Sequence, residues 1–290
     1  MGLRTKFNLM LAIVAFVGIA LFAIAATPIL EDQARSDVLQ SSRIMMESAT
    51  GARKYTSEQI APLLAHDMET TFHPQSVSAY AAKKNFDVLH ARFRDYSYRE
   101  VALNPTNLDD RAGDWESDLI NDFRDHPEKQ EIVLERRTPV GPTLNLARPL
   151  VSKQACLRCH STPEAAPKSM VSLYGPRNGF GWKLDDVIGA QIVSVPLAVP
   201  LARASHVRLL FLGVYGAVFG LLFLLLNLLL GVMVIGPIDR MASAAEAISL
   251  GNMDAPEYVR DGSDQIARLS VAINRMRRSL VEALRLLSDG

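Results

Sequence analysis

The chain has 290 residues, and its 31 basic and 31 acidic side chains leave no formal net charge at pH 7. A balanced charge gives no electrostatic reason to expect nucleic acid, so we exclude that class of partner, and the length suits one sizeable domain with smaller additions. Apolar residues make up 49% of the chain and are concentrated in two stretches, which indicates membrane spans.

The first apolar stretch, residues 7–30, contains no charged side chain. As a helix it would rise about 36 Å at 1.5 Å per residue, enough to cross the hydrocarbon core. Two basic residues precede it and two acidic residues follow it, so the positive-inside rule places residues 1–6 in the cytoplasm. The alternative is a cleaved signal peptide, because Ala23-Ile24-Ala25 has the small-x-small form of a cleavage site, although the apolar run exceeds the usual signal length.

Residues 31–206 follow as an outer domain in which helical periodicity gives way to alternation with period two. The predicted helices cover residues 32–64, 76–94 and 115–123, and the predicted strands cover residues 131–137, 143–151 and 187–199. Pro62 marks the expected end of the first helix, and Val140-Gly141-Pro142 is a predicted turn. Helices followed by an antiparallel sheet indicate an α+β domain of the PAS-like kind.

Just past the second predicted strand, Cys156-Leu157-Arg158-Cys159-His160 form the motif Cys-x-x-Cys-His. Two thiols three positions apart can add across the two vinyl groups of one haem, and the adjacent imidazole then lies beneath the iron. The motif therefore predicts one covalently attached haem c, held by Cys156 and Cys159, with His160 as the proximal iron ligand. We expect the motif in a loop carried by the sheet, with the haem between the sheet and the helices.

Two other uses of the cysteine pair are possible. A disulfide or a thiol redox couple usually sits in a βαβ frame and does not require the histidine. A zinc site needs four ligands, and the chain has only two cysteines.

Haem thioethers are made on the periplasmic side of the inner membrane in bacteria with two membranes, which agrees with the topology predicted from the first span.

Segments on both sides of the motif resemble a family of periplasmic c-type haem sensor domains of PAS-like shape. The segments are Arg53 and Tyr55, Asn104-Pro105 through Trp115-Glu116, Ser161 to Pro167, Tyr174-Gly175 and Gly179-Phe180-Gly181-Trp182. They occur in order with the motif and cover most of residues 31–200. The resemblance implies that the first long helix lies over the haem.

The second axial ligand of the iron is left open by the sequence. A thiolate is excluded because there is no third cysteine. The placement of the first helix over the haem makes Met46 or Met45 the candidate distal ligand, with the alternative that both are core methionines. The competing histidines, each of which also suits an ordinary position, are His66, His73, His90 and His126.

Four further residues are candidates for the haem pocket. Arg53 and Arg148 can pair with the haem propionates through charge-assisted hydrogen bonds, although solvated surface positions are the ordinary use of arginine. Trp182, together with Phe180, can wall the porphyrin ring, or can belong to the core of the sheet.

The second apolar stretch, residues 209–238, is also free of charge and predicts a second transmembrane helix, which we assign to residues 207–236. Two spans place both termini in the cytoplasm and residues 31–206 in the periplasm. The sequence therefore predicts a multi-pass protein of the inner membrane.

Residues 237–290 read as two helices joined by a polar connector. Pro237 opens the first helix and Gly251 ends it, and Met253 and Val259 are apolar points in the connector. Apolar residues repeat at coiled-coil spacing at Ile238, Met241, Ala245 and Ile248, and again at Ile266, Leu269, Ile273, Met276, Leu280 and Leu287.

This pattern resembles a HAMP linker, from which it departs at Gln265 and Ala267, where an acidic residue and a glycine are expected. Two short helices cannot bury such faces alone, so we expect a homodimer whose two copies form a four-helix bundle. The alternative is an amphipathic helix on anionic lipid, because Arg275, Arg277 and Arg278 would suit that surface.

The sequence contains no Walker loop, no kinase histidine box and no ordered Ser, His and Asp set, so we predict no enzyme activity and expect a separate cytoplasmic signalling protein to carry the output. We hypothesise a membrane-bound sensor in which reduction of the haem, or binding of a small diatomic gas, biases the HAMP bundle. The alternatives are a membrane-anchored monohaem cytochrome that exchanges electrons with a periplasmic redox partner, and a binding module whose haem is structural.

Overall fold

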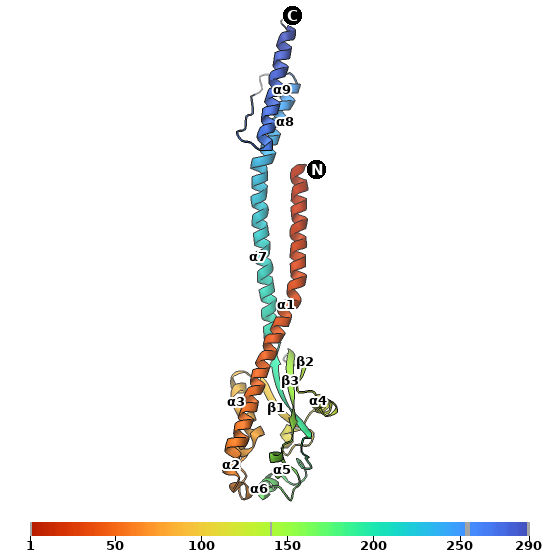
Figure 1. Ribbon diagram of the computed structural model, residues 1–290, viewed down its shortest axis with the longest axis vertical. Coiled ribbons are helices and arrows are strands. Elements are labelled where there is room, and N and C mark those ends of the chain that lie inside the picture. The colour runs from red at the N-terminus through yellow and green to blue at the C-terminus, as the bar shows by residue number, and fades with distance from the viewer. Residues whose placement is uncertain (1, 140, 253–255, 289–290) are drawn as a thin grey trace. The chain divides into compact units, whose positions relative to one another are not determined.

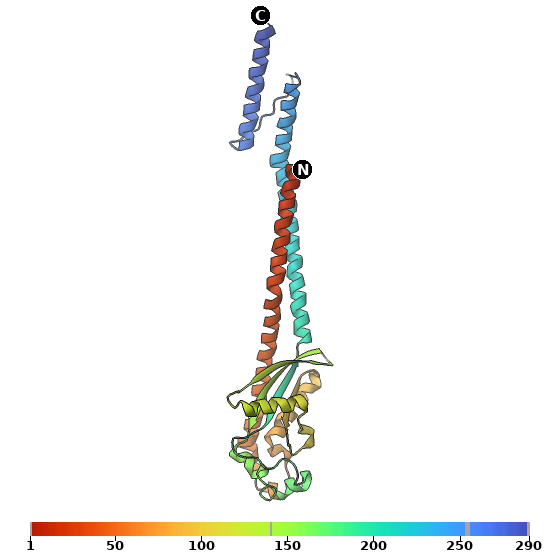
Figure 2. The same cartoon turned by 90° about the vertical axis from the view of Figure 1, so that its right-hand side faces the viewer.

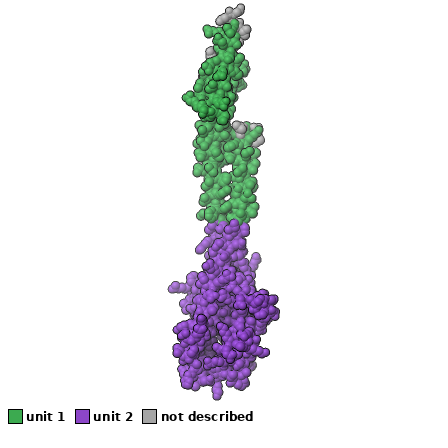
Figure 3. All heavy atoms as spheres, in the orientation of Figure 1, with its two compact units in different colours: residues 1–26, 208–290 green, residues 27–207 purple. Residues whose placement is uncertain are grey.

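Helix α1 (Leu3–Tyr55) joins the first predicted span and the helix expected after it, and Pro28 inside it does not end it. A single π-helical turn, η1 (Thr56–Ile60), follows, and then α2 (Ala61–Leu64), which has a proline in its first turn and ends the helical run near Pro62, as predicted. The structure is a computed structural model that describes residues 2–139, 141–252 and 256–288. It divides into two units, residues 27–207 and residues 1–26 with 208–290 (Figure 3).

The unit of residues 27–207 is built on a four-stranded antiparallel sheet in the order β1-β4-β3-β2. The strands are β1 (Ser97–Ala102), β2 (Ile132–Thr138), β3 (Gly141–Val151) and β4 (Val187–Pro196). The helices are α3 (Ser78–Arg92), α4 (Asp114–Asp125), α5 (Gln154–His160) and α6 (Lys168–Tyr174), with 3₁₀ turns η2 (Asp67–Glu69), η3 (Pro74–Ser76) and η4 (Leu108–Asp110). The α+β prediction is confirmed.

Each face of the sheet buries a separate apolar core, because side chains alternate between the two faces along each strand. The helices α1 and α3 cover one face, where Met46 and Phe86 pack against Leu146 and Val193. Helix α4 covers the other face (Figures 1 and 2). Its residues Leu119, Ile120 and Phe123 pack against Ala147 and Ile192.

The sequence did not predict strand β1 or the short helices α5 and α6. Strand β1 was not predicted, because its charged residues Arg99 and Glu100 hide the alternation; Glu100 is nonetheless buried, paired with Arg53. The Cys-x-x-Cys-His motif lies on the short helix α5, not in a loop. Seven residues are too few to show a helical period in sequence, so the local pattern gave no signal. Of the predicted turn Val140-Gly141-Pro142, Val140 lies outside the described residues, and Gly141 and Pro142 are the first two residues of β3.

The unit of residues 1–26 and 208–290 contains the first part of α1 and most of α7 (Ala198–Leu230). Both helices belong to stretches long and apolar enough to cross a membrane. They pack through aromatic rings: Phe22 stacks on Tyr215 at 5.7 Å between centroids and meets the edge of Phe211 at 6.4 Å. A Cβ at Gly18 would lie 3.3 Å from the Tyr215 hydroxyl, so glycine permits this close approach.

A π-helical turn, η5 (Gly231–Ile235), leads from α7 into α8 (Gly236–Ser249), and α9 (Gln265–Ser288) follows a connector. Helix α8 ends at Ser249 with Leu250 as its C-cap, and Gly251, at a φ of +91°, follows the cap, so the predicted end of the helix at this glycine is confirmed. Met241 and Ile248 of the first predicted seam are buried. The connector position Met253 and the side chain of Leu287 lie outside the described part of the chain.

Candidate functional site

The two cysteines of the motif lie three residues apart on α5, so their side chains share one face of the helix. Both are free thiols of intermediate exposure. The Cys156 sulfur accepts a hydrogen bond of 3.4 Å from the backbone N–H of Lys153. Burial raises the pKa of the Cys159 thiol. The pair is therefore accessible for attachment of a group from outside.

The imidazole of His160 is held in one tautomer. Its Nδ1 lies 2.7 Å from the carbonyl oxygen of Gly179, which can only accept, so Nδ1 carries the proton. Burial lowers the pKa of His160 below its ordinary value, which favours the neutral ring. The remaining nitrogen, Nε2, is then an unprotonated lone-pair donor of the kind that ligates haem iron.

Trp182 fixes the plane of the same imidazole. The two rings stack at 3.9 Å between centroids with an interplanar angle of 14°. The backbone N–H of Trp182 donates to the carbonyl of His160 at 3.2 Å, and the N–H of Gly181 donates to that of Ser161 at 2.9 Å. The segment of residues 179–182 thus satisfies carbonyls at the end of α5, where a helix has no donors of its own.

Thr106 completes the support of His160 from a different part of the chain. Its hydroxyl lies 3.4 Å from Nδ1 of the imidazole. Gly179 has a φ of +80°, and a Cβ there would lie 2.0 Å from the Thr106 hydroxyl and 2.9 Å from the Thr106 Cα. Glycine is required at this position by both its conformation and the close approach of Thr106. Sequence reasoning did not select Thr106, because nothing local marks a contact with a residue 54 positions away.

The predicted propionate partners lie in a polar band across the sheet face that α1 covers. Glu100, Gln191 and Arg148 are register partners on β1, β4 and β3. Arg53 of α1 pairs with the Glu100 carboxylate, which also accepts a hydrogen bond of 2.7 Å from Tyr98. Arg148 pairs with Glu47 at 2.7 Å and with Glu131 at 3.3 Å. Arg148 and the Glu100 partner of Arg53 thus share one rung of the sheet, and both arginines have carboxylate partners within the protein.

Two residues further along the strands, the next rung on the same face has small residues on β1 and β4. Ala102 pairs with Gly189 of β4, which pairs with Leu150 of β3, close to the end of the strand that precedes the motif. A Cβ at Gly189 would lie 2.2 Å from the carbonyl oxygen of Val101, so the close packing of β1 on β4 needs glycine there. The polar band therefore separates the apolar core from the motif end of the sheet.

The predicted distal ligands lie on the core side of this band. Met46 is fully buried among the apolar residues of α1, α3 and the sheet, and Met45 is partly buried beside that cluster. Their neighbours Leu146 and Val193 pair with each other two residues from the polar band, on the side away from the motif. Methionine ligation therefore stays a prediction.

Two of the competing histidines have other partners on the surface. The His90 imidazole bonds the carbonyl of Tyr96 at 3.0 Å, and that of His126 lies 2.9 Å from the Asp122 carboxylate; both are on the surface. His66 is exposed, and His73 precedes η3. Among the described residues, no three His, Cys, Asp or Glu side chains are grouped as for a metal ion.

The thiol redox alternative has little support in the geometry. The sheet is antiparallel, so the motif is not in a βαβ frame. Reactive thiols have a lowered pKa, whereas burial raises that of Cys159.

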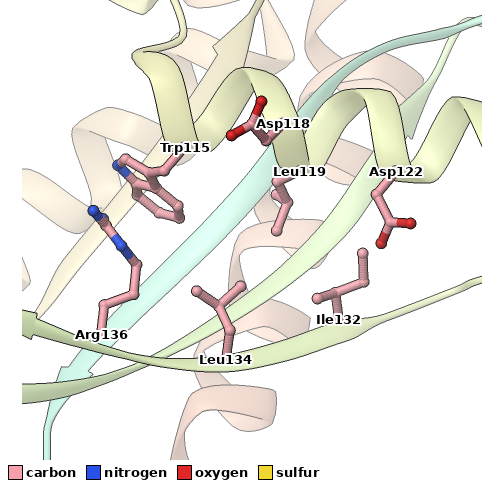
Figure 4. A pocket seen from close by; sticks show the side chains of 7 residues that line it. All are labelled: Trp115, Asp118, Leu119, Asp122, Ile132, Leu134 and Arg136. Carbon is pink, nitrogen blue, oxygen red and sulfur yellow. The ribbon is translucent and has the colours of Figure 1, made fainter.

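A hollow of about 350 Å³ lies between α4 and β2, on the face of the sheet opposite α1 (Figure 4). Trp115 and Arg136 form one end of it, with the guanidinium 4.0 Å from the centroid of the indole. Asp118 and Asp122 of α4 lie along its rim, over Ile132 and Leu134. None of the predicted haem residues lines this hollow, so we do not assign the haem to it.

Comparisons with known proteins agree with the two parts of the chain. The sequence profile of the Tll0287-like family matches residues 31–196, and that of the HAMP domain matches residues 229–282. The crystal structure of the cyanobacterial haem protein Tll0287 is similar over 55% of this chain and 95% of that one, with 18% identity and a TM-score of 0.45. No curated protein matches the chain.

Proposed function

Because the chain belongs to the Tll0287-like family, a family of haem proteins, and carries a HAMP domain after that domain, we propose that it is a membrane-bound c-type haem sensor. The observation that carries the proposal is the arrangement of α5: two thiols on one face and an adjacent imidazole whose Nδ1 proton is bound by Gly179. Both parts are of a non-catalytic, sensor type.

The residues present fit a covalently bound haem. Cys156 and Cys159 would form the two thioethers, and His160 would ligate the iron through Nε2. When bound, the haem supplies a metal centre that changes its charge on reduction or accepts a diatomic gas. Gly179, Thr106 and Trp182 hold the imidazole in one tautomer and one plane, so a change at the iron would be felt by α5 and by the segment of residues 179–182.

The position of Arg53 suits relay from this site. The haem propionates would lie within reach of Arg53 and Arg148 if the porphyrin occupies the motif end of the sheet, and would then compete with Glu100 for the Arg53 guanidinium. Arg53 is in the last turn of α1, and α1 runs as one helix back to residue 3. A small displacement of α1 is therefore the proposed output of the haem domain.

We assign residues 1–6 to the cytoplasm, 7–30 and 207–236 to transmembrane helices, 31–206 to a PAS-like haem domain in the periplasm, and 237–290 to the cytoplasmic HAMP domain. Two apolar helices and a HAMP domain are those of a membrane protein. Haem thioether chemistry outside the cytoplasm supports this orientation, with both termini inside.

The exposed side of α9 supports a homodimer. Among the side chains of this helix that the structure describes, the buried ones are Ala267, Ser270 and Asn274. The predicted seam residues Leu269 and Leu280 instead remain 46% and 43% exposed. A second copy would cover this face in a four-helix bundle, and two packings of such a bundle that differ by a few kcal/mol would make the switch read by a separate cytoplasmic signalling protein.

A cross-linking experiment tests this relay. The two natural cysteines are occupied by haem in the mature protein, so Leu280→Cys adds the one free thiol. The rate of bismaleimide cross-linking of the full chain in membranes should differ at least about threefold between oxidised, reduced and carbon-monoxide-treated protein. We expect this because a change of about 1 kcal/mol in the free-energy difference between the two packings of the bundle shifts their populations by more than that factor. The same variant in a Cys156→Ser, Cys159→Ser background is the control and should show one constant rate. If the rate in the haem-containing Leu280→Cys protein is as constant as in the control, the sensor proposal is wrong.

The second candidate function is electron transfer by a membrane-anchored monohaem cytochrome. The chain carries one Cys-x-x-Cys-His motif, and one haem is enough for an electron carrier. Stopped-flow mixing with periplasmic redox proteins separates the two. Rapid electron exchange together with a constant rate of cross-linking would identify the electron carrier.

The prediction of methionine ligation has its own test. Because leucine is close to methionine in volume, Met45→Leu with Met46→Leu should preserve the fold and remove the weak absorption band near ~695 nm that methionine gives to oxidised haem. Met68 provides the matched control, since its sulfur accepts a hydrogen bond of 3.3 Å from the His73 N–H in a segment outside α1. A band that persists in the double variant, or that is lost with Met68→Leu instead, would contradict the assignment.

A further inference from the structure

The junction between α7 and α8 contains a carbonyl that lacks its α-helical donor. Pro237 has no N–H, so the carbonyl of Met233, four residues earlier, has no α-helical donor. The preceding turn, η5, is π-helical and closes with a bond from the Gly236 N–H to the Gly231 carbonyl. A proline and a π-turn together interrupt the regular i→i−4 bonding at this point of the backbone.

Arg260, from the connector between α8 and α9, supplies that partner. Its Nη1 donates to the Met233 carbonyl at 2.9 Å, and its Nη2 lies 3.2 Å from the Asp264 carboxylate. Asp264 in turn caps α9, accepting from the Ala267 N–H at 2.6 Å. The Arg260 side chain is 22% exposed and so partly protected from water. One side chain thus joins the end of the membrane helix to the first turn of α9.

The rest of the connector is fixed to α9 beside this contact. The backbone N–H of Arg260 donates to the Ser270 hydroxyl at 3.4 Å, and the Asn274 side chain donates to the carbonyl of Tyr258 at 2.9 Å. A displacement at residue 233 would therefore move the connector and α9 together.

We propose that Arg260 is a positioning residue of the relay: its guanidinium caps the Met233 carbonyl exposed by Pro237 and thereby couples the exit of α7 to α9 directly, in parallel with the covalent path through α8. The role in signalling rests on the sensor function proposed above, whereas the capping contact does not. The connector then transmits the displacement itself. A connector that only links α8 to α9 would not need the hydrogen bond from Arg260 to Met233.

A double-substitution cycle tests the cap in the full haem-loaded chain in lipid nanodiscs. Hydrogen exchange of peptides that cover residues 256–275 should become about tenfold faster in Arg260→Gln, since a bond from a charged donor is lost. Pro237→Ala restores a backbone donor for Met233, so Arg260→Gln added to it should accelerate exchange by less than about threefold. Arg260→Lys keeps one charged donor and should give an intermediate rate.

The matched control is Arg268→Gln, which removes an exposed arginine of α9 and should leave exchange unchanged. Arg260→Gln exchanging no faster than this control, or accelerating exchange equally with and without Pro237→Ala, would overturn the cap. The relay role predicts that Arg260→Gln keeps the wild-type haem spectrum but loses the dependence of Leu280→Cys cross-linking on haem state. A fully retained dependence would overturn that role. If the parent protein shows no such dependence, the sensor function fails while the exchange cycle still decides the cap.

Discussion

Replacing Cys156 and Cys159 together with serine should abolish covalent haem while leaving the outer domain folded. Both sulfurs are partly exposed free thiols on α5, and neither belongs to the two apolar cores of the sheet. Haem staining after denaturing electrophoresis should disappear completely, and circular dichroism with limited proteolysis should show the folded domain. Each single variant keeps one sulfur and should retain a stained band of lower intensity.

This result separates the sensor from a module with structural haem. A structural role predicts that the double serine variant unfolds, with loss of protease resistance across residues 31–206. Cys156→Ala with Cys159→Ala should behave as the serine variant does, because Lys153, whose N–H donates to the Cys156 sulfur, is exposed and its N–H can bond water instead. Full haem staining in either double variant would show that attachment uses other residues.

Substituting Gly179 with alanine should damage the support of His160 more than any comparable change in the same loop. The new Cβ would meet the backbone Cα of Thr106 at 2.9 Å, which no side-chain rotation can relieve, and the φ of +80° adds strain. We expect a loss of about 3 kcal/mol in the free energy of unfolding, measured by chemical denaturation, and an altered haem spectrum because the carbonyl that fixes the imidazole shifts.

Gly181 is the matched control. It lies two residues further along, has a φ of +85°, and a Cβ there would meet no atom within 4 Å. Gly181→Ala should therefore cost only the strain of the backbone, about 1 kcal/mol. Thr106→Ala should partly rescue Gly179→Ala by removing the atom at 2.0 Å. Equal losses for the two glycine variants would contradict the assigned role of Thr106.

The sequence predicted the elements whose signals are local. The spans of α1 and α7 follow from long uncharged runs, and β2 to β4 follow from alternation. Strand β1 escaped prediction because Glu100 reads as a surface residue, and only the folded chain brings Arg53 and Tyr98 to it. The first turn of α9 likewise depends on Asp264 as a cap, which the pattern of apolar residues does not reveal.

Prediction of the site was limited in the same way. The haem attachment predicted for Cys156, Cys159 and His160 follows from five consecutive residues, so the sequence alone is enough to predict it. The support of His160 is not, because Gly179 and Thr106 are 19 and 54 residues away. Trp182 was selected as a candidate wall for the porphyrin, which stays a prediction, and the structure adds that its ring stacks on the imidazole of His160. Long-range contacts of this kind need the fold before they can be seen.

The central claim is that one haem is fixed by two sulfurs to α5. The most direct test is intact-mass spectrometry of the full chain made in cells that mature c-type cytochromes, followed by proteolytic mapping. We predict a mass greater than the polypeptide by one haem, located on the peptide that contains residues 156–160. The bare polypeptide mass from such cells would contradict covalent attachment of haem to α5.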